Sequence, residues 1–362
     1  MLDRVRNFLK GLQRSPAFRY LRRDIRAKIG GVIVLLVVFT AIFAGFIARH
    51  DPTTKNKITI SELLGGAIFK VEPNPYGGAF LLVTDNVTPD SDNTLGIILL
   101  QDVPAGTYTV TENVGKIEIR NVENKEILER FQGPSLKYPF GTDDSGRDIF
   151  SRVVYGARTA LLIGILLVVV QTSIGLPLGL LAGYRGGKVD NVIMRLVDAV
   201  LAMPGLIIAL AFVAVFGPGI YKVVLALAVT GWAGYARLIR GQTLAIKEEP
   251  YIESARAIGE KDRNIIFRYV LPNAISPLIV MVTMTFPAAI LLSSSMSFLG
   301  LGVQPPAPDW GYDLNAYRIY MADPWPAPLM SILPGIVMVI TIFGFNFFGD
   351  ALRDAYDPRL RE

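Results

Sequence analysis

The chain has 362 residues, of which 51% are hydrophobic and 19% charged, and its mean hydropathy is +0.42. An average soluble domain carries about 25% charged residues, so this composition excludes an ordinary soluble globular protein and indicates a polytopic membrane protein. The sequence contains no cysteine, which excludes disulfides and thiol chemistry.

Six windows of the sequence are apolar over the roughly 20 residues that a helix needs to cross a hydrocarbon core. We therefore expect an all-α polytopic membrane protein with six transmembrane helices. The windows cover residues 29–48, 159–184, 196–217, 220–239, 274–300 and 327–348. The first window is not expected to be a cleavable signal peptide, because no small-residue cleavage site follows it.

The first 28 residues form a basic arm, with nine basic residues, two acidic residues and a net charge of +7. The positive-inside rule places this arm in the cytoplasm, and six spans then place the tail, residues 350–362, there as well. Residues 51–158 are expected outside, and the net charge of −3 over residues 49–158 agrees. Basic residues beside a span usually serve topology or contact lipid, so we expect the bilayer, and no nucleic acid, as their partner.

Residues 57–124, between the first and second spans, have a different composition. Strand-forming residues alternate or cluster there between Gly, Pro, Asn and Asp, as in "LLGGAIFKV" and "LLQDVPAGTYTVTE". This pattern predicts an inserted extracytoplasmic β-sandwich. The two stretches resemble strands of Cna-B or SpaA-like, prealbumin-type surface domains. The resemblance implies either an internal amide bond between Lys57 and Asn121 beside Glu112, or a simple ion pair of the lysine. A role of the insertion in cargo delivery and no role in transport are both open.

The sequence contains neither a complete phosphate-binding loop for ATP nor a set of ionisable residues that could carry protons through the spans. The stretch "GLLAGYRGGKVD" resembles a phosphate-binding loop, but Ala182 stands where the first glycine is required and Val189 follows the lysine. Ionisable residues within the spans are essentially Asp198 and Lys222, whereas a proton-coupled carrier buries a relay of such groups. The lone His50 is expected to be an ordinary interfacial residue. We predict that the chain is not an enzyme and that a transport pore of this kind receives energy from another subunit.

A charged stretch, "EPYIESARAIGEKDRNIIFRYVLPN" (249–273), lies between the fourth and fifth spans. Apolar residues recur at helical spacing before and after Gly259, which predicts a short helix, a turn and a second helix. Gly259 is expected to end the first helix in the left-handed conformation, and Pro272 suits the first turn of the next span. The stretch is predicted to be a cytoplasmic docking loop.

This loop resembles the signature loop of permease subunits in bacterial and archaeal ABC importers. The matching positions are Glu253, Ser254, Ala255, Gly259, Tyr269, Leu271 and Pro272. Ser254 and Tyr269 replace the Ala and Ile of that pattern, and both changes are conservative in size or apolarity. The resemblance implies that the loop, residues 240–272, forms a coupling helix that docks on an ATP-binding subunit.

Three further stretches resemble the C-type permease of the dipeptide, oligopeptide and nickel group. They are "YPFGTDDSGRDIFSRVVYGARTAL", "SFLGLGVQPPAPDWG" and "FFGDALRDAYDPRLR". The resemblance implies a permease domain over residues 138–349 that forms half of a translocation pathway for peptides or a related cargo such as a nickel chelate. It also implies a B-type second permease, two ATPase subunits that bind ATP and Mg, and an external substrate-binding protein, with no cofactor in this chain.

Two alternatives and one local question remain open at the level of sequence. The chain is alternatively a membrane-anchored sensor or adhesin that uses the β-domain, or a secondary transporter. Six spans exceed what an anchor requires, and the docking loop favours the importer. The cluster from Gly141 to Asp148 either steers a cationic cargo or caps the start of the second span, with Arg147 paired to a neighbouring acid. The cap is the favoured interpretation.

Overall fold

The computed structural model describes residues 16–58, 69–73, 80–84, 106–113, 116–121, 127–128, 130–323 and 327–356. The chain forms two compact units. The first, which we call the helical unit, comprises Met1–Ile47, Val153–Arg318 and Ser331–Glu362. The second, which we call the loop unit, comprises Ala48–Arg152 and Ile319–Met330.

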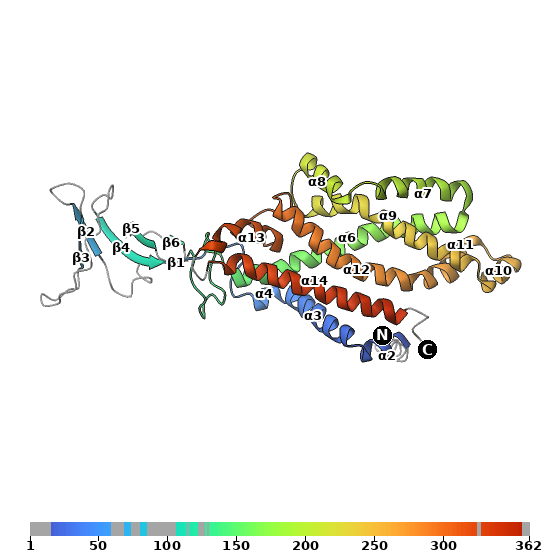
Figure 1. The fold of residues 1–362 in the computed structure, drawn as a ribbon, viewed down its shortest axis with the longest axis horizontal. Helices are drawn as coiled ribbons and strands as arrows, with labels where there is room; N and C mark the ends of the chain where they lie inside the picture. Colours follow the sequence, from blue (N-terminus) through green and yellow to red (C-terminus); the bar gives the residue numbers. More distant parts are fainter. Residues whose placement is uncertain are drawn as a thin grey trace. The chain divides into compact units, whose positions relative to one another are not determined.

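The described part of the chain is dominated by helices (Figure 1). They are α2 (Pro16–Arg23), α3 (Ile25–Ile42), α4 (Ala44–Ile47), α6 (Ile149–Arg185), α7 (Gly187–Leu201), α8 (Gly205–Phe216), α9 (Ile220–Lys247), α10 (Pro250–Ala257), α11 (Asp262–Ile265), α12 (Leu271–Phe298), α13 (Trp310–Tyr317) and α14 (Leu329–Tyr356). Among the described residues, five helical runs are long and apolar enough to cross a membrane: α3, α6, α9, the run from Asp262 to Phe298, and α14. They correspond to five of the six predicted windows.

Helices α6 and α9 pack closely and run in the same direction. A Cβ atom on Gly175 would lie 2.7 Å from the Trp232 carbonyl oxygen, and one on Gly179 would lie 2.6 Å from that of Ala236. Residue numbers at the contacts increase in the same direction along both helices, so the two helices are parallel. The chain must therefore return to the opposite end of the helical unit between the end of α6 and the start of α9, and the residues available for this are those of α7 and α8.

The third predicted span, 196–217, is not a single straight helix. Helices α7 and α8 are bent by 81° at a short break between Leu201 and Gly205. Pro204 stands in this break as the residue that precedes α8, with φ −64°. Proline has no N–H group and its ring clashes with the preceding helical turn, so a continuous helix through this position is disfavoured. The apolar window was recognised correctly, but its proline divides it.

Helices α12 and α14 pack in opposite directions. The rings of Phe286 and Phe345 stack with their centroids 5.0 Å apart, and a Cβ atom on Gly349 would lie 2.6 Å from the Met284 sulfur. Later residues of α14 therefore meet earlier residues of α12. The end of α14 consequently lies at the end of the helical unit where α10 and α11 precede α12 (Figure 1).

Helix α3 joins α14 at the same end. A Cβ atom on Gly30 would lie 2.5 Å from the Phe348 backbone nitrogen, so this contact requires glycine. Arg26 forms an ion pair of 2.7 Å with Asp354 and one of 2.8 Å with Asp24, whose side chain also caps the start of α3. The hydrogen bonds from Arg26 lower the pKa of the Asp24 carboxyl. The start of α3, the end of α14 and the α10–α11 segment therefore share one end.

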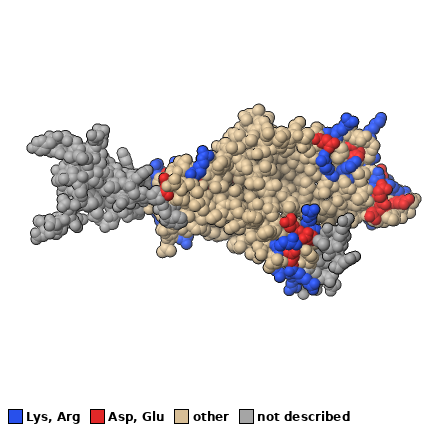
Figure 2. Space-filling view, in the orientation of Figure 1, with Lys and Arg blue, Asp and Glu red and all other residues tan. Residues whose placement is uncertain are grey.

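Charged side chains of the helical unit gather at its ends. Figure 2 shows Lys, Arg, Asp and Glu over the end that carries α10 and α11 and near α2. On the face shown, the surface over the middle of the long helices is almost free of them. This distribution is typical of a protein whose central belt contacts lipid and whose ends contact water.

The loop unit contains the β-structure. Strands β2 (Phe69–Pro73), β3 (Phe80–Thr84), β4 (Gly106–Asn113) and β5 (Lys116–Asn121) form an antiparallel sheet in the order β3-β2-β4-β5. Strands β1 (Lys57–Ile58) and β6 (Ile127–Leu128) form a separate two-stranded ladder. The insertion thus contains strands, as its composition predicts. The predicted β-sandwich is not found, because the described strands form one four-stranded sheet and one two-stranded ladder of two residues per strand, not two multi-stranded sheets packed face to face.

Candidate functional site

The α10–α11 hairpin is built by local sequence signals at both ends of α10. Glu249 precedes the helix in an extended conformation, and Pro250 occupies its first turn, where a missing N–H is harmless. Gly259 follows the helix with φ +79°. Its N–H donates to the Arg256 carbonyl at 2.9 Å, while the Glu260 N–H donates to the Ala255 carbonyl at 3.1 Å. These two bonds define a Schellman motif. The prediction that Gly259 ends the helix in the left-handed conformation is confirmed.

One face of the hairpin packs onto the ends of α6 and α9. Ile252, Ala255 and Ile265 are buried in one apolar cluster with Tyr184 and Ile246. The Tyr184 hydroxyl also donates a hydrogen bond of 2.7 Å to Asp262, in the first turn of α11. Burial of these side chains fixes the hairpin to the ends of the long helices.

The opposite face of the hairpin is open and mixed in character. Glu253 and Arg256 are exposed, and so is the apolar side chain of Ile258, at 82% exposure. Phe267, in the segment that follows α11, is 59% exposed. In the sequence Ile258 recurs at helical spacing with Ile252 and Ala255. Those two side chains are buried, whereas Ile258, at the end of α10 where the chain turns at Gly259, is exposed.

The signature residues of the docking loop all lie in this hairpin or directly after it, but they divide into two groups. Glu253, Ser254, Gly259 and Pro272 are exposed. Ala255 is buried, and Tyr269 and Leu271 pack against the same apolar cluster. The exposed group is available to a partner, whereas the second group holds the hairpin in place.

Pro272 lies in the first turn of α12, as predicted, but α12 does not begin as a separate helix. Residues Ile266–Val270 form a π-helical segment, which joins α11 to α12 without a break. The Leu271 N–H donates to the Ile266 carbonyl, five residues earlier. A π-bulge commonly accommodates an interruption of the α-helical hydrogen-bond pattern, and here it comes directly before the residue that lacks an N–H group. The expected second helix therefore continues straight into the fifth predicted span.

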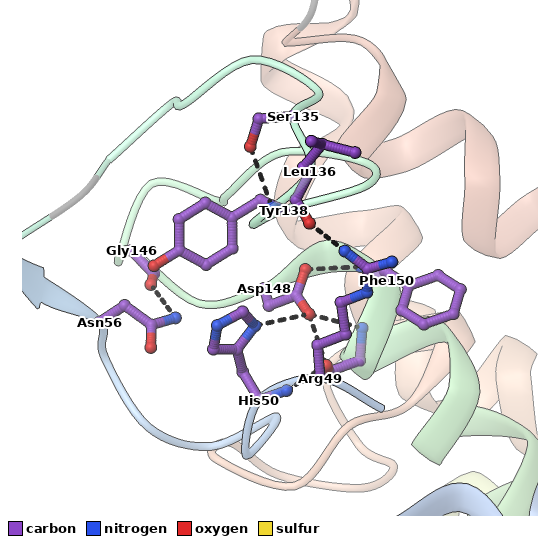
Figure 3. A network of polar contacts seen from close by, with 10 residues as sticks. Arg49, His50, Asn56, Ser135, Leu136, Tyr138, Gly146, Asp148 and Phe150 are labelled. Atoms are coloured by element: carbon purple, nitrogen blue, oxygen red, sulfur yellow. Dashed lines mark hydrogen bonds and ion pairs between the residues drawn. The ribbon is translucent and has the colours of Figure 1, made fainter. Parts of the chain in front are cut away.

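In the loop unit, Asp148 caps the start of α6 (Figure 3). Its fully buried carboxylate accepts hydrogen bonds from the backbone N–H groups of Phe150, at 3.2 Å, and Ser151, at 3.3 Å, and from the Ser151 hydroxyl. His50 Nδ1 lies 3.3 Å from the same carboxylate, and the His50 ring packs on Tyr138 with a centroid distance of 4.8 Å. His50 is thus part of a local polar network rather than a solitary interfacial residue.

Asp143 organises the turn that precedes this cap. Its carboxylate accepts from the backbone N–H groups of Ser145 and Arg147, each at 2.8 Å, and from Arg147 Nε at 2.7 Å. Arg147 is therefore paired with a neighbouring acid and the start of α6 is capped, as the favoured interpretation of the cluster from Gly141 to Asp148 predicts. Both carboxylates are occupied by donors of their own chain.

The backbone register does not bring the residues of the suggested internal amide bond together. Lys57 pairs with Leu128 in the two-stranded ladder, whereas Glu112 and Asn121 belong to the four-stranded sheet. Asn121 of β5 lies opposite Tyr108 of β4. Glu112 is also in β4, four residues after Tyr108. Four residues of strand span about 13 Å, so the acid is not beside the asparagine. The register argues against this bond, which an intact mass would test directly.

A stripe of glycines on α6 was not predicted from the sequence. Gly175, Gly179 and Gly183 recur at intervals of four, and each faces the backbone or a side chain of α9. Small residues at this spacing allow membrane helices to approach closely. The signal was visible in "GLPLGLLAGYR" (175–185). This contact positions α9, and with it the α10–α11 hairpin.

Two families match the sequence. Residues 175–362 match the family described as "Binding-protein-dependent transport system inner membrane component". Residues 14–64 match the "N-terminal TM domain of oligopeptide transport permease C". The first match covers the α10–α11 hairpin, and the second covers α3 and α4. The larger part of the insertion, together with the start of α6, lies between them.

Curated relatives of the chain are transport permeases. The chain is 46% identical over 230 residues to the "Glutathione transport system permease protein GsiD" of Pectobacterium atrosepticum, covering 64% of this chain and 75% of that protein. It is 42% identical over 232 residues to the "Dipeptide transport system permease protein DppC" of Alkalihalophilus pseudofirmus, with the same coverage.

A solved structure is also similar, more distantly. A chain of "Inward facing conformations of the MetNI methionine ABC transporter" is 22% identical, with 57% of this chain and 96% of that chain covered and a TM-score of 0.45. This likeness is too weak to carry a conclusion. The family match over more than half of the sequence and the close relatives are sufficient: the chain belongs to the inner-membrane permease family of binding-protein-dependent ABC importers, in its dipeptide, glutathione and oligopeptide branch.

Proposed function

We propose that this permease forms half of a translocation pathway that imports short peptides. The relatives named above transport glutathione and dipeptides, which are both short peptides. The proposal therefore favours a peptide over a nickel chelate. A B-type second permease would complete the pathway, two ATPase subunits would supply energy, and an external binding protein would deliver the cargo.

The observation that carries the proposal is the outward face of the α10–α11 hairpin. Ile258 and Phe267 are large, apolar and exposed among charged residues, at an end of the helical unit that is rich in charge. Exposed apolar side chains surrounded by polar groups are typical of protein interfaces. We assign Glu253, Ser254, Ile258 and Phe267 to direct contact with an ATPase subunit, and Ala255, Tyr269 and Leu271 to support of that surface.

The same geometry supports a topology with six spans. The parallel packing of α6 and α9 requires one crossing between them, which the bent α7–α8 pair supplies as a broken span. The start of α3, the α10–α11 hairpin and the end of α14 share one end, and the basic arm of residues 1–28 assigns that end to the cytoplasm. Residues 51–158 are then extracytoplasmic.

Co-purification with the ATPase subunits tests the proposal. Ile258→Asp introduces a charge into the proposed contact, so we expect the ATPase subunits to be lost from the purified complex while membrane insertion is unchanged. Leu136→Asp is the matched control, because Leu136 is 91% exposed but lies in the loop unit. Retention of the ATPases by Ile258→Asp at the wild-type ratio would show that the hairpin is not the docking surface.

A further inference from the structure

A cavity of about 480 Å³ lies within the helical unit. Its walls come from the middle of α6, α9 and α12 and from the start of α8. Small-molecule sites usually have volumes of about 300–1,000 Å³, so the cavity has the size of a site for a compact ligand. It lies well away from the α10–α11 hairpin along each of these helices, near the centre of the proposed spans.

The cavity combines apolar walls with a few uncharged polar groups. Its polar side chains are Gln171, Thr230, Tyr235 and Thr285, and among the described residues that line it none is Lys, Arg, Asp or Glu. Uncharged hydrogen-bonding groups in a membrane-embedded wall are costly to leave without partners. Each of the four contacts a partner within the protein, and the hydrogen-bonding capacity that remains suits a ligand with amide or hydroxyl groups better than a lipid chain.

The hydrogen bonds on the α9 and α12 side define what this wall can offer. The Thr285 hydroxyl donates to the Met281 carbonyl at 2.9 Å, so its single proton is committed. The Tyr235 hydroxyl, 2.6 Å from the Thr285 oxygen, must then be the donor in that pair. The Tyr235 oxygen also interacts with the Thr172 hydroxyl, and its remaining lone pair can accept a hydrogen bond from an N–H group of a ligand.

One turn before Tyr235 along α9, Gln171 of α6 lies against Gly231 and offers an amide that is only weakly engaged. Its Nε2 atom lies 3.4 Å from the Leu227 carbonyl oxygen, which is longer than an ordinary hydrogen bond. A Cβ atom on Gly231 would lie 1.8 Å from the same Nε2, so the glutamine occupies space that only glycine leaves open. The amide carries both donors and an acceptor, and it is complementary to a peptide bond.

The remaining wall tolerates different ligands. Met281 and Met284 line the cavity, and unbranched thioether side chains adapt to varied shapes. The amide and hydroxyl groups can form hydrogen bonds with a peptide bond. The flexible thioethers and the absence of charge allow different side chains beside it. We propose that this cavity is a cargo subsite of the translocation pathway that binds the backbone amide of a short peptide. The proposal rests on the proposed function as an importer permease.

Cysteine protection in the assembled importer tests the subsite, since this chain has no cysteine of its own. Ala288→Cys places a thiol in the cavity wall, and Thr283→Cys places one on the same helix beside Gly349 of α14. The rate at which a small thiol reagent modifies this chain is measured in proteoliposomes with and without trialanine. We expect trialanine to slow modification of Ala288→Cys and to leave Thr283→Cys unaffected.

Two further arms identify the chemistry. Trialanine methylated on its peptide nitrogens lacks the N–H groups that would donate a hydrogen bond to Tyr235. It should therefore protect the Ala288→Cys thiol less than trialanine does. Gln171→Leu in the Ala288→Cys background should raise the protective trialanine concentration roughly fivefold, as expected for loss of one neutral hydrogen bond. Thr283→Val, which removes a hydroxyl outside the cavity, should not change that concentration.

The possible results distinguish failure of the subsite from failure of the proposed function. Uptake of labelled trialanine by the wild-type importer is measured in the same vesicles, and its absence would contradict the proposed peptide cargo. Uptake with equal protection at both cysteines would indicate closure of the whole pathway and overturn the subsite. Complete resistance of Ala288→Cys to the reagent would show that a partner subunit or lipid fills the cavity, which also overturns it.

Discussion

Gly259 shows how a single backbone conformation shapes the docking surface. Its φ of +79° closes the Schellman motif that turns the chain from α10 toward α11 and directs Ile258 outward. A Cβ atom there would meet nothing within 4 Å, so the requirement for glycine is conformational and not steric. The left-handed conformation costs other residues roughly 1–2 kcal/mol, with asparagine among the most tolerant.

We therefore expect Gly259→Val to insert into the membrane normally but to bind its ATPase subunits weakly, because the strained turn misdirects α11. Gly259→Asn, which tolerates the same conformation, should retain them. The measurement is ATPase co-purification and cargo uptake in vesicles with matched protein levels. Wild-type uptake by Gly259→Val would show that the shape of this turn is not needed for coupling.

Asp309 is a buried acid whose pKa is changed by its surroundings. It precedes α13, outside the spanning helices, and its carboxylate accepts from the Tyr312 N–H at 2.8 Å as the helix cap. Burial raises the pKa of this carboxyl from 3.8 to about 6. Between pH 3.8 and about 6, the Asp309 carboxyl is protonated more fully in the folded protein than in the unfolded chain. The free energy of unfolding therefore falls as the pH rises from about 4 to about 6.

This shift predicts a loss of about 3 kcal/mol in stability across that pH range from the one carboxyl. Asp309→Asn keeps a capping oxygen but cannot ionise, so its thermal midpoint should lack this pH-dependent decrease. The midpoints are compared at pH 4.5 and 7.5 in detergent. Asp323→Asn, a change at an exposed acid, is the control and should follow the wild type. Identical pH profiles for Asp309→Asn and the wild type would contradict the assignment.

At the scale of elements, the α6–α9 contact determines how the long helices are arranged. Three glycines of α6 bring its backbone against that of α9, and the contact makes the two helices parallel. Their parallel direction in turn requires the broken α7–α8 span between them. Close approach through small residues, rather than burial of large apolar side chains, is the usual basis of packing between membrane helices.

Gly179→Val should separate these helices, because a Cβ atom at this position would lie 2.6 Å from the Ala236 carbonyl oxygen. Overpacking of this kind costs roughly 1–3 kcal/mol, which should appear as a lower thermal midpoint. Gly241→Val makes the same chemical change on α9, where a Cβ atom would meet nothing within 4 Å. A midpoint for Gly179→Val equal to that of Gly241→Val would show that α6 and α9 are not in close contact.

At the scale of the whole molecule, the proposed topology places both termini and the docking hairpin on one side of the membrane. Leu136 is exposed in the segment assigned to the outside, and Lys188 is exposed in the first turn of α7, at the proposed cytoplasmic end. In intact cells an impermeant thiol reagent should modify Leu136→Cys and spare Lys188→Cys. Permeabilised cells, in which both should react, provide the control. Modification of Lys188→Cys alone would invert the topology.

The sequence by itself determined the features that depend on local chemistry. Apolar length identified five spans, and Gly259 determined where α10 ends. The capping function of the cluster from Gly141 to Asp148 was also accessible, because Asp148 and Arg147 act on neighbours within four residues. Each of these features depends on interactions between residues that are close in the chain.

Only the tertiary structure decided features that depend on distant residues. Composition predicted strands in the insertion, but pairing between strands decided that the described ones form a four-stranded sheet and a separate two-stranded ladder. Lys57 lies in the ladder, whereas Glu112 and Asn121 lie in the sheet. The outward position of Ile258 depended on which face of α10 meets α6 and α9, and the amide of Gln171 lies in a cavity only because Gly231 of α9 leaves it space. A hydrophobic pattern records that a residue is apolar, but the packing of separate helices determines which face is covered and which is left for a partner.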